Sequence, residues 1–111
     1  MDPQFEIRIL VKAEEFLGSL DEAPRRKVIY NLRKAQSSHD PELFKKLDGD
    51  IWEFRTTYNG IRYRLLAFWD KRDNKNTLVV CTHGIVKKVS KVPAKEIEKA
   101  RGIMESYFTN G

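Results

Sequence analysis

The stretch WEFRTTYNGIRYRLLAFW, residues 52–69, decides how this chain folds. Two runs rich in aromatic and β-branched residues flank Asn59-Gly60, the favoured pair for a two-residue type I′ hairpin turn. Such a turn fixes which residues face each other across the hairpin. The expected pairs are Tyr58 with Ile61, Thr56 with Tyr63, Arg55 with Arg64, Phe54 with Leu65, and Trp52 with Ala67.

Alternation along this hairpin assigns its side chains to two faces. The face expected in the core carries Trp52, Phe54, Thr56, Tyr63, Leu65 and Ala67. The other face carries Glu53, Arg55, Thr57, Arg62 and Arg64. Like charges directly opposite each other destabilise a sheet, so the Arg55–Arg64 pair needs an explanation. One is solvation, with Glu53 in partial compensation; the other is a phosphate clamp, since guanidinium groups bind phosphate in a bidentate manner.

Upstream of the hairpin, the pattern predicts a strand and then two helices. Apolar and polar residues alternate from Phe5 to Val11, as in a half-buried strand. The apolar stripe of the first helix is Ala13, Phe16, Leu17 and Leu20. Asp21 is a natural N-cap for the second helix, and the short linker indicates an antiparallel helical hairpin.

The second helix is amphipathic, and a polar break follows it. Its apolar face carries Val28, Ile29, Leu32 and Ala35. Its other face carries Arg25, Arg26, Lys27, Arg33 and Lys34. Beyond the break, Leu43, Phe44 and Leu47 form a short apolar cluster before an Asp48-Gly49 turn.

Downstream of the hairpin, one strand and one helix are predicted. Leu78 to Ile85 is a continuous apolar strand, and Pro93 is the expected first residue of a helix. The stripe of that helix is Ile97, Ala100, Met104 and Phe108. We therefore expect one α+β domain over residues 1–111. In it, an N-terminal strand and a helical hairpin pack on a twisted antiparallel sheet, made of the β-hairpin and one further strand, and a C-terminal helix follows.

The surplus positive charge is confined to one part of the chain. Between Trp52 and Lys91 there are nine Lys or Arg residues and three acidic residues, a net charge of +6. The whole chain has 21 basic and 16 acidic residues, so the remainder carries 12 and 13, a net charge of −1. A basic sheet on a nearly neutral body indicates that one face meets a polyanion.

Composition narrows the function classes further. No apolar run approaches the roughly 18–20 residues of a membrane span, and the N-terminus lacks the basic start of a signal peptide. The single cysteine, Cys81, excludes an internal disulfide and indicates the cytoplasm. Two histidines without HxH or HExxH spacing predict no metal site, and we expect no cofactor and no membrane association.

Further polar candidates follow the last predicted strand. His83 is the only side chain near the basic region whose ordinary pKa is close to neutrality, although such a histidine is more often a core or rim residue. Lys87, Lys88 and Lys91 add cations at the strand end. Phe68 and Trp69 are expected in the core, whereas Lys71, Arg72 and Lys75 are expected at a solvated loop tip.

Two runs of the sequence resemble those of the RelE/ParE toxin superfamily, in particular its HigB-like, phage Gp49-like branch. The first is Leu47 to Arg55 with Asn59 to Arg64, which is similar to that family's W-E-x-R … G-x-x-Y-R core. The second, His83 to Ile97, is similar to its H-G-F-x-K-K-x-x-K-x-P-x-x-E-I ending. The family's order of helices and strands matches the one predicted above.

The resemblance implies a function and roles for single residues. RelE- and HigB-type toxins of type II toxin–antitoxin systems are ribosome-dependent mRNA endonucleases (mRNA interferases), and a cognate antitoxin neutralises them. By this resemblance Arg64 contacts the scissile phosphate, Arg55 matches a basic position on the first hairpin strand, and Lys87 and Lys88 lie where relatives also place a cation. From the residues themselves we expect Arg55, Arg62 and Lys91 to bind RNA, Lys87 or Lys88 to add charge stabilisation, and His83 to be the candidate acid or base. The expected partners are the ribosome, mRNA and an antitoxin with a helix-turn-helix DNA-binding domain.

Two rival functions stay open at this point. ParE-type relatives inhibit DNA gyrase without being nucleases, and a plain RNA-binding module would show no activity. The chain also departs from some nucleases of the family, because no tyrosine closely follows Lys88 and the next is Tyr107. The antitoxin could cover the arginine face or dock on the helical hairpin.

Overall fold

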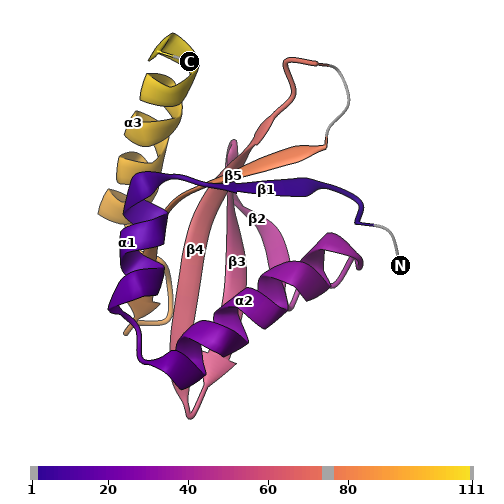
Figure 1. The fold of residues 1–111 in the computed structure, drawn as a ribbon. Helices are drawn as coiled ribbons and strands as arrows, with labels where there is room; N and C mark the ends of the chain where they lie inside the picture. The colour runs from indigo at the N-terminus through magenta and orange to yellow at the C-terminus, as the bar shows by residue number, and fades with distance from the viewer. Residues whose placement is uncertain (1–2, 74–76, 111) are drawn as a thin grey trace.

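A computed structural model describes residues 3–73 and 77–110 and shows an α+β fold. In chain order the elements are β1 (Glu6–Ile9), α1 (Val11–Ser19), α2 (Glu22–Gln36), β2 (Phe44–Asp48), β3 (Ile51–Tyr58), β4 (Ile61–Asp70), β5 (Leu78–Lys87) and α3 (Ala94–Asn110). The strands form one sheet in the order β1-β5-β4-β3-β2. Figure 1 shows α2 crossing this sheet near the β3–β4 turn and α3 toward the opposite end. Among the described residues, no helix is long and apolar enough to cross a membrane.

The central hairpin confirms the predicted register. Trp52 pairs with Ala67, Arg55 with Arg64, and Tyr58 with Ile61, as the turn requires. Asn59 and Gly60 have φ angles of 49° and 77°. Positive φ at both central positions is the signature of a type I′ turn, which few residues other than Asn and Gly adopt at low cost.

The sheet is larger than expected, and it is mixed. The segment Phe44–Asp48, predicted only as an apolar cluster, is strand β2 and pairs antiparallel with β3. The N-terminal strand does not pack on the sheet; it belongs to the sheet, as β1 pairs parallel with β5 from Glu6↔Leu78 to Ile9↔Cys81. The predicted antiparallel sheet, β3 to β5, is therefore extended by β2 at one edge and by the parallel strand β1 at the other.

Two apolar cores lie on opposite faces of the sheet. On one face, α1 and α2 cover a core that contains Ala13, Val28, Leu32, Leu65 and Cys81. On the other face, α3 covers a second core. Its buried members are Ile51, Leu66, Phe68, Val80, Val92 and Ala100. Because Leu65 and Leu66 are neighbours on β4, alternation places these two cores on different faces.

The second core lies on the face of the hairpin that carries the arginines. Glu53 and Arg64 are each only 3% exposed, so that face is not open to water along its whole length. The predicted division into two faces is confirmed in register. Helix α3 covers the part of this face that carries Leu66 and Phe68, because its apolar stripe needs a sheet face to pack against.

Several smaller expectations are also resolved. Phe68 and Cys81 are fully buried, as predicted, and burial raises the pKa of the Cys81 thiol. Pro93 does not begin the last helix but precedes it, and its carbonyl accepts hydrogen bonds from the amides of Glu96 and Ile97. Lys75 lies outside the described residues.

Gly84 allows α1 to pack closely on β5. A Cβ atom at this position would collide with the ring of Phe16. We therefore expect Gly84→Ala to lower the free energy of unfolding by about 1–3 kcal/mol through overpacking. Urea denaturation measures this directly.

Gly102→Ala is the matched control, because a Cβ atom there meets nothing within 4 Å. In an exposed helix we expect it to raise the free energy of unfolding by up to about 1 kcal/mol. Equal stability of the two variants would contradict the packing argument.

Candidate phosphate-binding site

The face of the sheet that carries α3 changes from apolar to cationic toward the β3–β4 turn. The strand registers place its side chains in rows across β3, β4 and β5. From the turn inward the rows are Thr57–Arg62–Lys87, Arg55–Arg64–Ile85 and Glu53–Leu66–His83. The turn and the C-terminal half of α3 lie at opposite ends of the molecule (Figure 1). The cationic rows therefore lie beyond the part of the face that α3 covers.

Glu53 holds two of these arginines. Arg64 Nε lies 3.2 Å from Glu53 Oε1, and both side chains are almost completely buried. Arg55 Nε lies 3.9 Å from Glu53 Oε2, and the Arg55 side chain remains 23% exposed. Arg64 also donates from Nη1 to the carbonyl of Tyr63 at 3.0 Å. One buried carboxylate thus joins the Arg55–Arg64 pair that appeared unfavourable from sequence.

The cluster keeps an excess of positive charge. Arg55, Arg62, Arg64 and Lys87 face one buried carboxylate, Glu53, and the exposed Glu42 lies 3.9 Å from Arg55, so two of the four positive charges stay uncompensated. Burial lowers the pKa of the Arg64 guanidinium, and Glu53 opposes this change. Burial also lowers the pKa of Lys87, and the neighbouring arginines add to the effect while Glu53 opposes it. An anion placed here would relieve the repulsion, so this cluster is the candidate phosphate-binding site.

The structure separates the three predicted lysines. Lys87 is half-buried and belongs to the cluster through its row with Arg62. Lys88 and Lys91 follow the end of β5 and are exposed. Within residues 3–73 and 77–110, no hydrogen bond or ion pair joins them to the arginines.

His83 lies on the same face but is bonded at both ring nitrogens. It is 2% exposed; Nε2 lies 3.0 Å from Glu96 Oε1, and Nδ1 lies 3.0 Å from Thr82 Oγ1. A neutral ring can donate from Nε2 to Glu96, and Nδ1 then accepts from the Thr82 hydroxyl when that hydroxyl leaves the Leu66 carbonyl, 3.2 Å away. The contact between His83 and Glu96 joins β5 to the first turn of α3. A role for His83 in proton transfer would therefore require its Nε2 to separate from Glu96.

A second polar cluster fixes the C-terminal helix. Arg72, expected at a solvated tip, donates to both carboxylate oxygens of Asp70 and lies over the rings of Tyr107 and Phe108. The Tyr107 hydroxyl donates to Asp70 at 2.7 Å and accepts from Arg8 at 2.7 Å. The Arg72 bond holds the pKa of Asp70 well below its usual range. Tyr107 is therefore bonded in a structural network away from the cationic rows.

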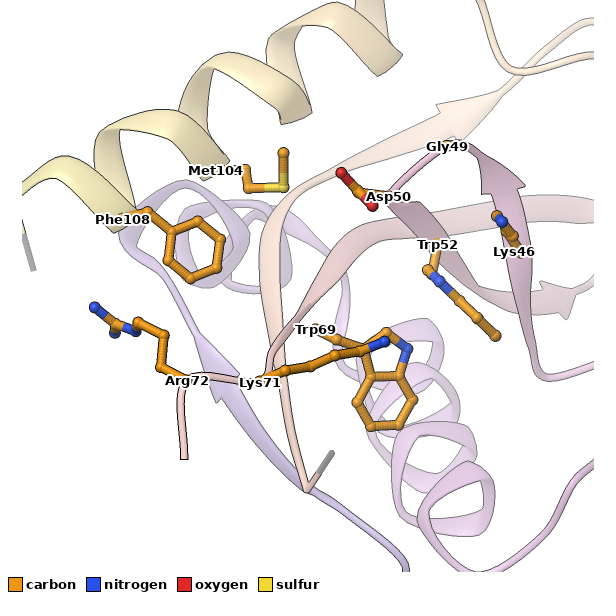
Figure 2. Close-up of a pocket in the computed structure, with 9 residues that line it drawn as sticks. All are labelled: Lys46, Gly49, Asp50, Trp52, Trp69, Lys71, Arg72, Met104 and Phe108. Atoms are coloured by element: carbon orange, nitrogen blue, oxygen red, sulfur yellow. The ribbon is translucent and has the colours of Figure 1, made fainter. Parts of the chain in front are cut away.

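A hollow of about 570 Å³ at the other end of the sheet is aromatic in character (Figure 2). Trp52 and Trp69 line it, with their ring centroids 6.0 Å apart and nearly perpendicular. Trp69 is half-buried, although it was expected in the core. The charged residues of its lining are all exposed. They are Lys46, Asp50, Lys71 and Arg72. Arg72 is already paired with Asp70 and Asp50 is itself negative, so we do not place the phosphate site here.

The sequence reasoning missed two contributors to the site. Glu53 was noted only as partial compensation, although its place two residues before Arg55 puts it on the arginine face. Glu96 was quoted only as part of the last motif, and no local signal brings it to His83. Among the described residues, no three His, Cys, Asp or Glu side chains are grouped as for a metal ion.

The environment of His83 predicts a pH dependence of stability. Burial lowers its pKa, Lys99 and Lys12 act in the same direction, and Glu96 opposes them. The unfolded chain, with a histidine pKa near 6.5, therefore binds the proton more readily. Stability from neutral His83 is complete above that pH and decreases as the pH falls through about 6.5 toward the lower folded value.

We expect the free energy of urea unfolding of the wild type to decrease between pH 7.5 and 5.0. For His83→Gln we expect a smaller decrease over the same range. Comparing the two slopes removes the contribution of the other titrating groups. Identical slopes in the two proteins would contradict the assignment.

Comparisons with known proteins agree with this fold. The family model described as "Phage derived protein Gp49-like (DUF891)" matches residues 15–105. A solved structure, the toxin–antitoxin complex RelBE2 from Mycobacterium tuberculosis, contains a similar chain with a TM-score of 0.54 and 21% sequence identity. The match covers 78% of this chain and 94% of that one. No curated protein matches. With most of its length matched by the family model, the chain belongs to the phage-derived Gp49-like family.

Proposed function

We propose that this protein is the toxin of a type II toxin–antitoxin system and that it cleaves mRNA on the ribosome. The observation that carries the proposal is the cluster of Arg55, Arg62, Arg64 and Lys87 around one buried carboxylate. Membership of the Gp49-like family and a fold shared with a chain of a toxin–antitoxin complex support it. A cytoplasmic protein acting on ribosomes and message follows from the same proposal.

The reaction that we assign needs mainly charge stabilisation. The 2′-hydroxyl of RNA attacks the adjacent phosphorus, its proton leaves to a base, and the 5′-oxygen departs with a proton from an acid. Negative charge builds up on the phosphate oxygens in the transition state, and preorganised cations stabilise it. Arg55 and Arg64 line one cavity, so both can face the same phosphate.

Proton transfer is assigned within the same face of the sheet. The lowered pKa of Lys87 suits an ammonium that gives its proton to the leaving 5′-oxygen. His83 is the sequence's candidate acid or base, and it can act only after its bond to Glu96 opens. We propose Lys91 and Lys88 as contacts to RNA outside the reacting phosphate.

The antitoxin is the proposed partner of this chain. The similar solved chain comes from a toxin–antitoxin complex, and we extend that kind of assembly to this protein. We propose an antitoxin with a helix-turn-helix DNA-binding domain. The two uncompensated positive charges favour an acidic antitoxin segment that covers the Arg55–Arg64 site as the neutralising contact.

Arg64→Lys tests the phosphate clamp without unpairing Glu53. Removing the cation would leave a buried carboxylate short of a partner and could cost about 3–5 kcal/mol. Lysine keeps the positive charge but lacks the planar guanidinium group that binds phosphate in a bidentate manner. We expect ribosome-dependent cleavage to fall by about 10²–10³-fold, measured by primer extension on abundant messages after induction.

Urea denaturation of Arg64→Lys must show a folded protein for this result to count. Cleavage at the wild-type rate by a folded variant would contradict the clamp. Growth arrest by the wild type with uncut message and damaged DNA would contradict the nuclease proposal and favour gyrase as the target.

Lys87 and Lys88 offer a matched pair of neighbouring cations. Only Lys87 lies in the arginine rows, so we expect Lys87→Met to lower the cleavage rate by about 10²-fold and Lys88→Met to change it less than about threefold. Both substitutions remove one charge, so nonspecific attraction to the ribosome changes equally. Equal losses in the two variants would contradict the assignment of Lys87.

A further inference from the structure

The outer edge of β3 is open beside the arginine cluster. Strand β2 pairs with β3 only from Asp48↔Ile51 to Phe44↔Phe54, and the Arg55 amide donates a last bond to the Leu43 carbonyl at 2.8 Å. Beyond Arg55, the described part of the chain places no strand on this side of β3. The edge next to the β3–β4 turn is thus accessible to another molecule.

Helix α2 adds a row of polar side chains along this open edge. Val28, Leu32 and Ala35 hold α2 on the sheet, and Lys27, Asn31 and Lys34 form the adjacent stripe. Asn31 Nδ2 donates to Thr56 Oγ1 on β3 at 3.1 Å. Spacings of four and three residues keep this stripe on one side of the helix.

A groove of about 290 Å³ connects this stripe with the arginine cluster. Its lining is Lys27, Asn31, Lys34, Glu42, Leu43, Arg55, Thr56, Thr57 and Arg64. Four cations therefore face one carboxylate, and that carboxylate, Glu42, is exposed and 3.9 Å from Arg55. The groove runs around the edge of the sheet, because Arg55 and Arg64 belong to one face and α2 packs on the other.

The two lysines keep their charge available. Neither has an ion-pair partner within residues 3–73 and 77–110. The Lys27 ammonium lies 5.3 Å from the ring centroid of Tyr30, a contact that leaves the charge uncompensated. Tyr30 is itself exposed, so this side of α2 presents a cation and an aromatic ring together.

We infer that single-stranded RNA reaches the Arg55–Arg64 site over the open edge of β3, with Lys27 and Lys34 of α2 holding backbone phosphates. This inference rests on the proposed function and adds a path to it. Single-stranded RNA fits this groove because the groove is polar and cationic along its length. The extended RNA backbone can also bend around the edge of the sheet. Glu42 opposes binding at the rim and must turn away from Arg55.

The test compares two double variants of the same helix. Lys27→Glu with Lys34→Glu changes the groove, whereas Arg26→Glu with Arg33→Glu makes the same change of charge at the same seven-residue spacing on the side away from the sheet. The probe is a fluorescein-labelled 2′-O-methyl oligouridylate of about ten nucleotides, which cannot undergo the cleavage reaction. Fluorescence anisotropy over a range of salt concentrations gives its affinity.

For the groove variant we expect binding at least about 10-fold weaker than for the control variant. The slope of log K against log salt should also fall by about 1.4, since each phosphate contact on a single strand contributes about 0.7. Glu42→Gln should tighten binding several-fold. Urea denaturation of each variant establishes that it is folded.

Other outcomes separate this inference from the proposed function. If the wild type cleaves message on ribosomes but the two double variants bind the probe equally, the path over β3 is wrong and the nuclease stands. A wild type that cleaves message but does not bind the probe would likewise overturn the path and leave the nuclease in place. If the wild type cuts no message, the proposed function fails, whereas groove-specific binding would still support an RNA site.

Discussion

The positive φ angles of Asn59 and Gly60 determine most of the architecture of this protein. A type I′ turn of two residues sets the register of β3 against β4, and a shift of one residue would move every side chain to the other face. With this register, Leu65 faces α1 and α2 while Leu66 faces α3, so both cores depend on it. The same register brings Arg55 opposite Arg64.

Glu53 offsets the repulsion between Arg55 and Arg64. Two like charges about 4 Å apart repel by about 4 kcal/mol at an effective dielectric constant of 20. Glu53 lies within 3.2 Å of Arg64 and 3.9 Å of Arg55, so each arginine has an attraction of the same order. The carboxylate is in turn desolvated, and both arginines are needed to hold it charged. The three side chains form one unit, and a change in any of them affects the others.

Short-range patterns in the sequence predict most of the fold. The Asn59-Gly60 turn, the strand alternation and the helical stripes depend on neighbouring residues, and the structure confirms most of them. The exceptions are Val11, which begins α1 instead of ending a strand, and Ile29 and Phe108, which are exposed. Strand β2 was missed because Phe44 to Asp48 holds two adjacent lysines and pairs through an irregular register next to Asp48. The parallel pairing of β1 with β5 joins residues about seventy positions apart, and no short-range pattern records such a contact.

The candidate site was predicted only in part, because some of its contacts join residues that are far apart in the sequence. The turn register gave the arginine rows and placed Glu53 on the same face, since all of them lie on one hairpin. It could not give the burial of Glu53 and Arg64, which depends on how the elements pack together. The bond between His83 and Glu96 joins the end of one element to the start of the next, and the groove under α2 depends on the length of β2. These features follow from packing between elements, which the sequence pattern does not describe.

One face of the sheet therefore has two parts with opposite energetics. Beneath α3, Ile51, Leu66 and Phe68 bury apolar area, at roughly 25 cal/mol for each square ångström, and this contributes stability. Toward the turn, two uncompensated positive charges reduce stability until an anion binds. The continuous strands β3 and β4 join the two parts, so the packed part holds the cationic part in place. A loop could not keep four like charges at this spacing, because they would move apart. The rigid hairpin is what makes a crowded cationic site possible in a chain of this size.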